Sequence, residues 1–145
     1  MQGKRILIVD DEAQIALTLC RALSLPLGGG HHVEVSPSAY AALTRFPRER
    51  FDLIITDLRM PGISGLELIR RVRQNSPQTR TILITAYGDD EVEAEVRRLQ
   101  VCRYVTKPFR IAQFILIVRE VLASPRTIAA RPMEPVEEYK LAQAM

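Results

Sequence analysis

The segment Ile54–Gly62, which reads IITDLRMPG, ends an apolar run with a carboxylate and places a turn directly after it. Ile54, Ile55 and Thr56 are β-branched, and such residues favour strands because they pack well on a pleated surface. Met-Pro-Gly over residues 60–62 is a turn signature. The segment therefore predicts a buried strand, Leu53–Thr56, that presents Asp57 at its carboxyl end.

Similar short runs rich in Ile, Val, Leu and Thr recur along the chain and predict further strands. Three of the runs are apolar at nearly every position, which is typical of a parallel sheet covered by helices on both faces. A weaker run follows the Pro/Gly-rich turn LPLGGGHH. The predicted strands are Arg5–Val9, His32–Val35, Leu53–Thr56, Thr81–Thr85 and Cys102–Thr106.

Amphipathic segments separate these runs and predict helices. Ser64 with Glu67, and Asp90 with Glu93, have the spacing of capping boxes that open two of them. Alternation of strand and helix through five repeats predicts an α/β domain with a parallel sheet. The predicted helices contain Ile15–Leu23, Tyr40–Phe46 (with Pro37 in the first turn after Ser36), Leu66–Val72, the segment after Asp90, and Ile111–Leu122.

The regular pattern predicts one domain over residues 1–123. From Ser124 the sequence holds three prolines and its charges cancel. Residues 124–145 are therefore predicted to be a flexible tail or linker, with a short helix over Val136–Ala144. This segment is too short for a helix-turn-helix domain.

Composition excludes several function classes. The chain has 20 Lys and Arg residues against 17 Asp and Glu residues, and a net charge of +3 is too mild to indicate direct nucleic-acid binding. No apolar run approaches the roughly 20 residues that span a bilayer, and the N-terminus does not resemble a signal peptide. Cys20 and Cys102 have no metal-ligand spacing and are expected to be buried thiols. His31 and His32 are expected to lie in a solvated turn, and a cytoplasmic protein is predicted.

Polar residues follow the predicted strands at their carboxyl ends, where sites gather in parallel α/β sheets. Asp10-Asp11-Glu12, Asp57, Thr85-Ala86 and Lys107 occupy these positions. Clustered carboxylates suit Mg²⁺, which prefers oxygen ligands and bridges to phosphate oxygens. A lysine and a hydroxyl are donors for phosphoryl oxygens. The set predicts a carboxylate that attacks phosphorus and forms an aspartyl phosphate.

Four segments together resemble the response-regulator receiver family, in that family's order and spacing. They are ILIVDDE (6–12), LIITDLRMPGISGLELI (53–69), ILITAYGD (82–89) and YVTKPF (104–109). The resemblance implies a (βα)5 flavodoxin-like fold with a five-stranded parallel sheet of order 2-1-3-4-5. It also implies a cis peptide bond between Lys107 and Pro108.

The resemblance assigns a role to each matching residue. Asp57 would be the phosphoacceptor, Lys107 would pair with the phosphoryl group, and Thr85 would move toward it. The Ala86 main-chain amide would bind a phosphoryl oxygen, and Tyr104 would be an aromatic switch that turns inward. The implied Mg²⁺ ligands are Asp11, Asp57 and the main-chain carbonyl of Arg59, which bind directly, and Asp10, which binds through water.

The implied function is that of a switch in a two-component system or phosphorelay, not of an enzyme. A sensor histidine kinase or a phosphotransfer protein would donate the phosphoryl group in a Mg²⁺-dependent step. The surface of the fourth helix, fifth strand and fifth helix would then change and control an output partner. A homodimer through that surface is a further expectation, because Leu116 and Ile117 are predicted to lie outside the sheet-facing side of the last helix.

Two other function classes share some of these sequence features. A hydrolase with an aspartyl-phosphate intermediate would place an acid two residues after Asp57, where this chain has Arg59, which cannot donate a proton at neutral pH. The other alternative is a receiver fragment of a DNA-binding regulator whose output domain is absent.

Two departures from the family pattern are Val101-Cys102, in place of Gly-Ala, and the pair Arg59 and Tyr87, which would flank and shield the phosphoryl pocket.

Overall fold

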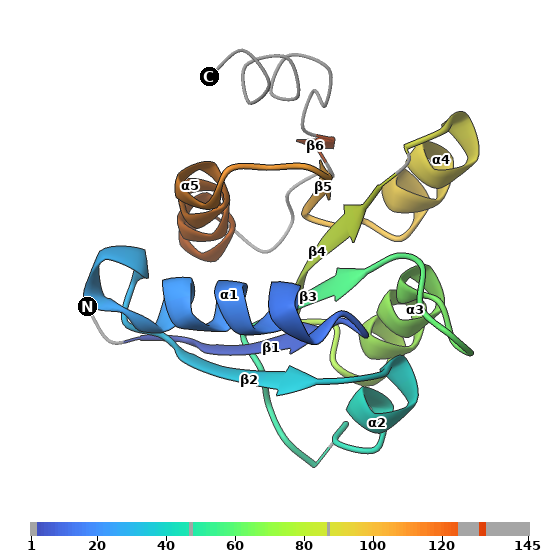
Figure 1. The fold of residues 1–145 in the computed structure, drawn as a ribbon. Coiled ribbons are helices and arrows are strands. Elements are labelled where there is room, and N and C mark those ends of the chain that lie inside the picture. The colour runs from blue at the N-terminus through green and yellow to red at the C-terminus, as the bar shows by residue number, and fades with distance from the viewer. Residues whose placement is uncertain (1–2, 47, 87, 125–130, 133–145) are drawn as a thin grey trace.

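β-Branched and aliphatic residues form the strands of one parallel sheet in the computed structural model, which describes residues 3–46, 48–86, 88–124 and 131–132. The strand order is β2-β1-β3-β4-β5-β6 (Figure 1). This order confirms the predicted 2-1-3-4-5 arrangement. The strands are β1 (Arg5–Val9), β2 (His32–Ser36), β3 (Leu53–Asp57), β4 (Arg80–Thr85), β5 (Arg103–Thr106) and β6 (Arg131–Pro132).

The short strand β6 was not predicted. It pairs in parallel with Arg103 and Tyr104 of β5 and lies in the segment expected to be a flexible tail. The predicted helix Val136–Ala144 lies outside the described residues.

Helices cover both faces of the sheet, as the continuous apolar strands predicted. The helices α1 and α5 pack on one face, and α2, α3 and α4 pack on the other (Figure 1). No helix among the described residues has the length and apolar character needed to cross a bilayer. The helices are α1 (Ala13–Ser24), the short 3-10 helix η1 (Pro26–Gly28), α2 (Ala39–Leu43), α3 (Gly65–Asn75), α4 (Asp90–Arg98) and α5 (Ile111–Ala123).

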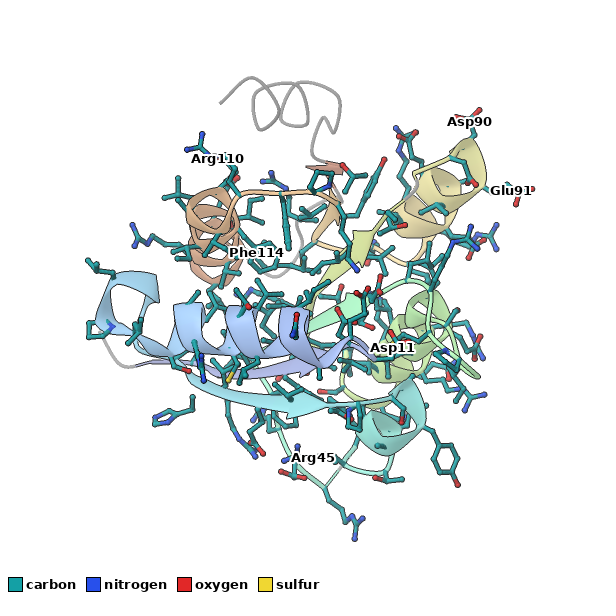
Figure 2. The ribbon with its side chains drawn as sticks, in the orientation of Figure 1. Asp11, Arg45, Asp90, Glu91, Arg110 and Phe114 are labelled. Atoms are coloured by element: carbon teal, nitrogen blue, oxygen red, sulfur yellow. The ribbon has the colours of Figure 1, made fainter. Side chains whose placement is uncertain are left out.

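Side-chain caps begin three of the helices, two of them at residues other than those predicted. Ser64 accepts a hydrogen bond from the Glu67 amide, as the capping box predicted. Helix α4 is capped by Asp89 rather than Asp90, and α2 by Ser38 rather than Ser36, because Ser36 completes β2. Asp90 is the first residue of α4 and projects outward with Glu91 (Figure 2).

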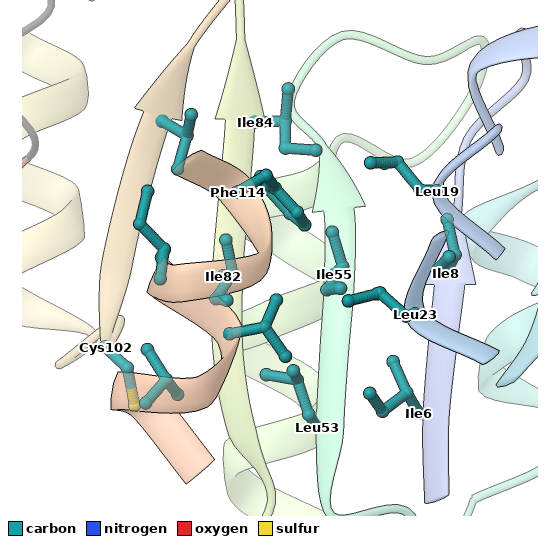
Figure 3. Packing of buried hydrophobic residues seen from close by; sticks show 14 of the residues in the cluster. Ile6, Ile8, Leu19, Leu23, Leu53, Ile55, Ile82, Ile84, Cys102 and Phe114 are labelled. Atoms are coloured by element: carbon teal, nitrogen blue, oxygen red, sulfur yellow. The ribbon is translucent and has the colours of Figure 1, made fainter. Parts of the chain in front are cut away.

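Successive residues of each strand enter opposite layers of the core. In β1, Ile6 and Ile8 pack beneath α1 and α5, whereas Leu7 and Val9 pack against α2 and α3. Phe114 of α5 lies over the sheet on the α1 side, near Ile82 and Ile84 of β4 (Figure 3). The sheet is thus buried on both sides, and Asp57 and Thr85 are the last residues of β3 and β4, at its carboxyl edge.

The exposed side of α5 is narrower than the sequence predicted. Ile117 was expected beside Leu116 on that side, but Ile117 is only 2% exposed and belongs to the core. The reason is that α5 contacts α1 as well as the sheet, so its buried face is broader than one sheet contact requires. Of the two residues expected on the exposed side of α5, only Leu116 is exposed, at 52%.

Candidate functional site

The turn after β3 holds the backbone of Asp57 against the start of α3. Gly62 adopts a positive φ of 81°, which glycine tolerates without strain. The Gly65 amide donates to the Leu58 carbonyl at 2.9 Å, and a Cβ on Gly65 would lie 2.1 Å from the Asp57 carbonyl oxygen. Leu58 in turn donates its amide to Ile84 of β4 at 2.7 Å. The turn therefore fixes where the Asp57 carboxylate stands, which explains why it follows the strand directly.

Three carboxylates meet at the carboxyl ends of β1 and β3. Oxygen atoms of Asp10, Asp11 and Asp57 all lie within 4.8 Å of one another. Asp10 and Asp57 are buried and Asp11 is exposed. Asp11 lies just after β1, before the start of α1 (Figure 2). Among the described residues, this is the one cluster of acids, histidines and cysteines with metal-ligand spacing.

Electrostatics at this cluster favour a cation. Burial raises the pKa of Asp10 to about 6, and the nearby charge of Asp57 adds to the effect, against the hydrogen bond from the Glu12 amide. Uncompensated carboxylates in a partly buried site repel one another. An all-oxygen donor set with one exposed member fits Mg²⁺, which keeps several waters. Asp10, Asp11 and Asp57 are therefore suited to hold it.

Lys107 reaches the same cluster from the loop after β5. Its Nζ lies 3.2 Å from Oδ2 of Asp57 and 3.4 Å from Oε1 of Glu12. Burial alone would lower the pKa of Lys107, but attraction by Asp57 and Asp10 outweighs it and the pKa is raised. The peptide bond from Lys107 to Pro108 is cis, as predicted. A charged ammonium is thus held beside the Asp57 carboxylate.

Thr85 ends β4 next to these groups and is fully buried. Its carbonyl accepts a hydrogen bond from the Lys107 amide at 2.8 Å, so the backbones of the two residues are tied together. Ala86 and Arg59 are exposed beyond the ends of β4 and β3. Tyr87, expected to shield the pocket with Arg59, lies outside the described residues.

Tyr104 lies in a separate cluster beneath α4. Its side chain is 1% exposed, so the ring is already inside the protein, and the predicted inward movement stays a prediction. The hydroxyl donates to Oε1 of Glu93 at 2.7 Å, and burial followed by this hydrogen bond raises the pKa of Tyr104. Glu93 therefore accepts the hydrogen bond of the Tyr104 hydroxyl, although its sequence spacing had suggested a role in capping the helix.

Sequence reasoning did not predict the contact of Glu12 with Lys107 or that of Glu93 with Tyr104. Glu12 stands in the predicted cluster only as the third acid of Asp10-Asp11-Glu12. No signal in the sequence distinguishes the Tyr104 contact of Glu93 from a capping role. In the predicted turn, His31 accepts a hydrogen bond from the Lys4 amide at 3.0 Å through Nδ1.

The model of the response regulator receiver domain matches residues 6–119. The chain belongs to this family. Receiver domains act in two-component signal transduction, and the family is a phosphoacceptor switch rather than a conventional enzyme. The flavodoxin-like fold of this receiver is the one that the resemblance predicted.

Known proteins similar to this receiver differ widely in how much of their length it covers. It is 34% identical over 119 residues to response regulator protein FleR of Pseudomonas aeruginosa, covering 81% of this chain and 24% of FleR. It is 30% identical to sporulation initiation phosphotransferase F of Bacillus subtilis, covering 84% of this chain and 96% of that protein. The chain thus spans about a quarter of FleR but nearly all of the sporulation protein.

Solved structures agree with the fold. A CheY-like receiver domain protein from Methanospirillum hungatei has a TM-score of 0.78 and 27% identity, covering 83% of this chain and 94% of that one. The BeF3-activated DrrB receiver domain has a TM-score of 0.76 and 26% identity, covering 85% of this chain and all of that one.

Proposed function

We propose that this receiver accepts a phosphoryl group on Asp57 from a phosphohistidine of a sensor histidine kinase or a phosphotransfer protein. The observation that carries the proposal is the contact of 3.2 Å between Asp57 and Lys107 inside a cluster of three carboxylates. A nucleophilic carboxylate needs cations beside it, because charge develops on the phosphoryl oxygens during transfer.

In the proposed step, an Asp57 carboxylate oxygen attacks phosphorus, the phosphorus–nitrogen bond to the donor imidazole breaks, and a phosphorus–oxygen bond forms. Lys107 neutralises negative charge on the phosphoryl group. The Thr85 hydroxyl and the Ala86 amide donate hydrogen bonds to phosphoryl oxygens. Mg²⁺ would be held by Asp11, Asp57 and the Arg59 carbonyl directly and by Asp10 through water, and it would supply further neutralising charge.

An apolar hollow beside the site supports docking of a protein donor. It lies between α1 and the loop after β5, has a volume of about 390 Å³ and includes Lys107 at its edge. Apolar surface next to a reacting group allows a partner to exclude water while it delivers a phosphoryl group. The hollow is lined by Gln14, Ile15, Thr18, Leu19, Lys107, Pro108, Phe109 and Ile111.

Phosphorylation would change the surface of α4, β5 and α5, which an output partner or a second receiver would recognise. The free cysteines Cys20 and Cys102 fit a cytoplasmic location. A hydrolase remains disfavoured, because Arg59 stands where its acid would be needed.

A second candidate is a receiver unit of a longer DNA-binding regulator. The observation in its favour is that the chain covers 26% of DNA-binding transcriptional regulator NtrC of Salmonella typhimurium, at 28% identity. In both cases the role of Asp57 is the same.

Incubation with acetyl phosphate and Mg²⁺ tests the proposal. The intact protein should gain one phosphoryl mass that is lost at alkaline pH, as expected of an acyl phosphate, and Asp57→Asn should abolish the gain. Asp11→Ala should weaken labelling in a way that higher Mg²⁺ concentrations partly restore, because it removes a metal ligand. Unchanged labelling of Asp57→Asn would reject Asp57 as the acceptor.

A further inference from the structure

Tyr104 is held from two directions by the chain that follows β4. Its hydroxyl donates to Glu93 of α4 at 2.7 Å. Gly88, in the connection between β4 and α4, lies against the same ring: a Cβ there would be 3.4 Å from Cε2 and 3.5 Å from the hydroxyl oxygen. One aromatic side chain of β5 therefore contacts both α4 and the loop that leads into it.

The hydrogen bond to Glu93 satisfies a hydroxyl that is otherwise removed from water. Tyr104 packs with Leu83 of β4 and with Val92 and Val96 of α4. A buried hydroxyl without an acceptor is costly, and bonds to a carboxylate are stronger than neutral ones. Glu93 thus stabilises the position of α4 over β5, in addition to the apolar contacts of that helix.

Helix α4 also carries a cation at a spacing that favours pairing with Glu93. Arg97 lies four residues later, and a glutamate preceding an arginine at this spacing is the favourable order on a helix. Within the described ranges Arg97 makes no ion pair, whereas Arg98 pairs with Glu95. The charge of Arg97 lowers the pKa of Tyr104, so it acts near this hydroxyl.

We propose that Glu93 is a positioning residue that holds α4 through the Tyr104 hydroxyl and exchanges this partner for Arg97 when the phosphoryl site is filled. The inference rests on the proposed function, because its trigger is movement of Thr85 toward a phosphoryl oxygen. Thr85 lies three residues before Gly88, which packs on Tyr104, so a displacement of Thr85 would be passed along the chain toward that contact. The two partners of one carboxylate give α4 two arrangements whose populations a ligand can shift.

Hydrogen exchange of the α4 amides in the unphosphorylated protein tests the contact itself. Glu93→Ala and Tyr104→Phe should each speed exchange of these amides roughly tenfold, since a bond of about 1.4 kcal/mol corresponds to that factor. Glu93→Gln, which keeps an acceptor, should stay within about threefold of wild type. Glu95→Ala is the matched control on the same helix and should change nothing, because Glu95 forms an exposed pair with Arg98. Equal effects of Glu93→Ala and Glu95→Ala would overturn the proposal.

Binding of beryllofluoride with Mg²⁺, followed by amide chemical shifts, tests the exchange of partners. Glu93→Ala should bind several-fold more tightly than wild type, because the bond to Tyr104 no longer has to be broken. Arg97→Ala should bind about twofold more weakly with unchanged α4 exchange in the free protein, because only the second arrangement loses a contact. Unaltered binding in both variants would show that Glu93 does not couple α4 to the site.

The two proposals fail separately. The exchange difference between Glu93→Ala and wild type should persist in an Asp57→Asn background, which has no phosphoacceptor. Loss of the difference there would contradict the Glu93 contact, whereas phosphorylation at another residue would contradict only the proposed function.

Discussion

At the scale of single residues, burial of Asp10 has a cost in stability that a bound cation would relieve. Asp10 is only 3% exposed, and burial raises its pKa to about 6. Lys107 contacts Asp57 rather than Asp10, so it compensates the buried Asp10 charge only from a distance. The buried Asp10 carboxylate therefore lowers the stability of the metal-free protein, as expected if its role is to hold the proposed cation.

Asp10→Asn should stabilise the metal-free protein at pH 7 by about 1–2 kcal/mol, less than the full pKa shift allows, because water reaches the site. The amide oxygen can still accept the Glu12 hydrogen bond that the carboxylate accepts at 2.9 Å. Urea unfolding with a chelator present measures the change.

The pH dependence provides a check with a definite sign. The pKa of Asp10 is higher in the folded protein than the usual 3.8, so its contribution to stability is present below about pH 4 and is lost as pH rises through about 6. Wild type should therefore gain stability from pH 7 to pH 5, and Asp10→Asn should lack that gain. A variant less stable than wild type at pH 7 without metal would contradict this interpretation.

Sequence reasoning located Asp10, Asp11, Asp57 and Lys107 because strand ends deliver them to one edge, whatever their side-chain conformations. Contacts of long side chains were not predictable in the same way. Glu12 meets Lys107 across 95 residues of sequence, and Glu93 reaches a tyrosine on another strand. Such contacts depend on rotamers and on helix positions that spacing alone does not determine.

At the scale of elements, the turn between β3 and α3 positions the proposed phosphoacceptor. Gly65 begins α3 where its Cα faces the Asp57 carbonyl, and a side chain there would meet that oxygen at 2.1 Å. The backbone of Gly65 fixes the position of any Cβ there, and the Asp57 oxygen is itself a backbone atom. A larger residue therefore cannot be accommodated by a side-chain rotation.

Gly65→Ala should destabilise the protein by about 1–3 kcal/mol and slow labelling by acetyl phosphate, because the helix must move away from Asp57. Gly88→Ala is the control: its Cβ would lie at an ordinary contact distance of 3.4 Å from Tyr104, and stability should change little. Urea unfolding and initial labelling rates measure both variants. Equal stability of Gly65→Ala and wild type would show that the turn is not restrictive.

Helix boundaries and faces were less predictable than helix existence. Asp89 and Asp90 are neighbouring acids of equal capping propensity, and only the backbone path decides that Asp89 caps α4. Likewise, the buried face of α5 includes Ile117 because α1 packs beside it. Periodicity describes one helix at a time, so it does not reveal how many neighbours a helix has.

At the scale of the whole molecule, continuous apolar strands alternating with helices were sufficient to predict the α/β class. The strand order came from the family resemblance. That order makes β3 and β4 neighbours, and the structure adds their register, which places Asp57 opposite Ile84. The pairing of β6 with β5 was not foreseen, because two residues among three prolines carry no strand pattern.

The exposed leucine on α5 tests whether phosphorylation leads to pairing of two receivers through α4, β5 and α5. Leu116 is 52% exposed, and a two-fold contact would bury the same patch on both copies. Ile117 cannot be used in such a test, since it lies in the core and its substitution would report on folding. We expect beryllofluoride with Mg²⁺ to shift the protein toward dimer in sedimentation experiments at matched concentrations.

Leu116→Glu should weaken that dimer at least tenfold, because each copy would bury a charge in place of an apolar side chain. Leu17→Glu makes the same chemical change at a leucine of α1 that is 48% exposed, and it should leave the dimer intact. Equal sedimentation of the two variants, or a monomeric wild type with beryllofluoride bound, would contradict a dimer through α5. Leu116 would then lie in a surface for a different partner, and the output of the switch would have to be sought on α4, where the contact of Glu93 with Tyr104 links the helix to β5.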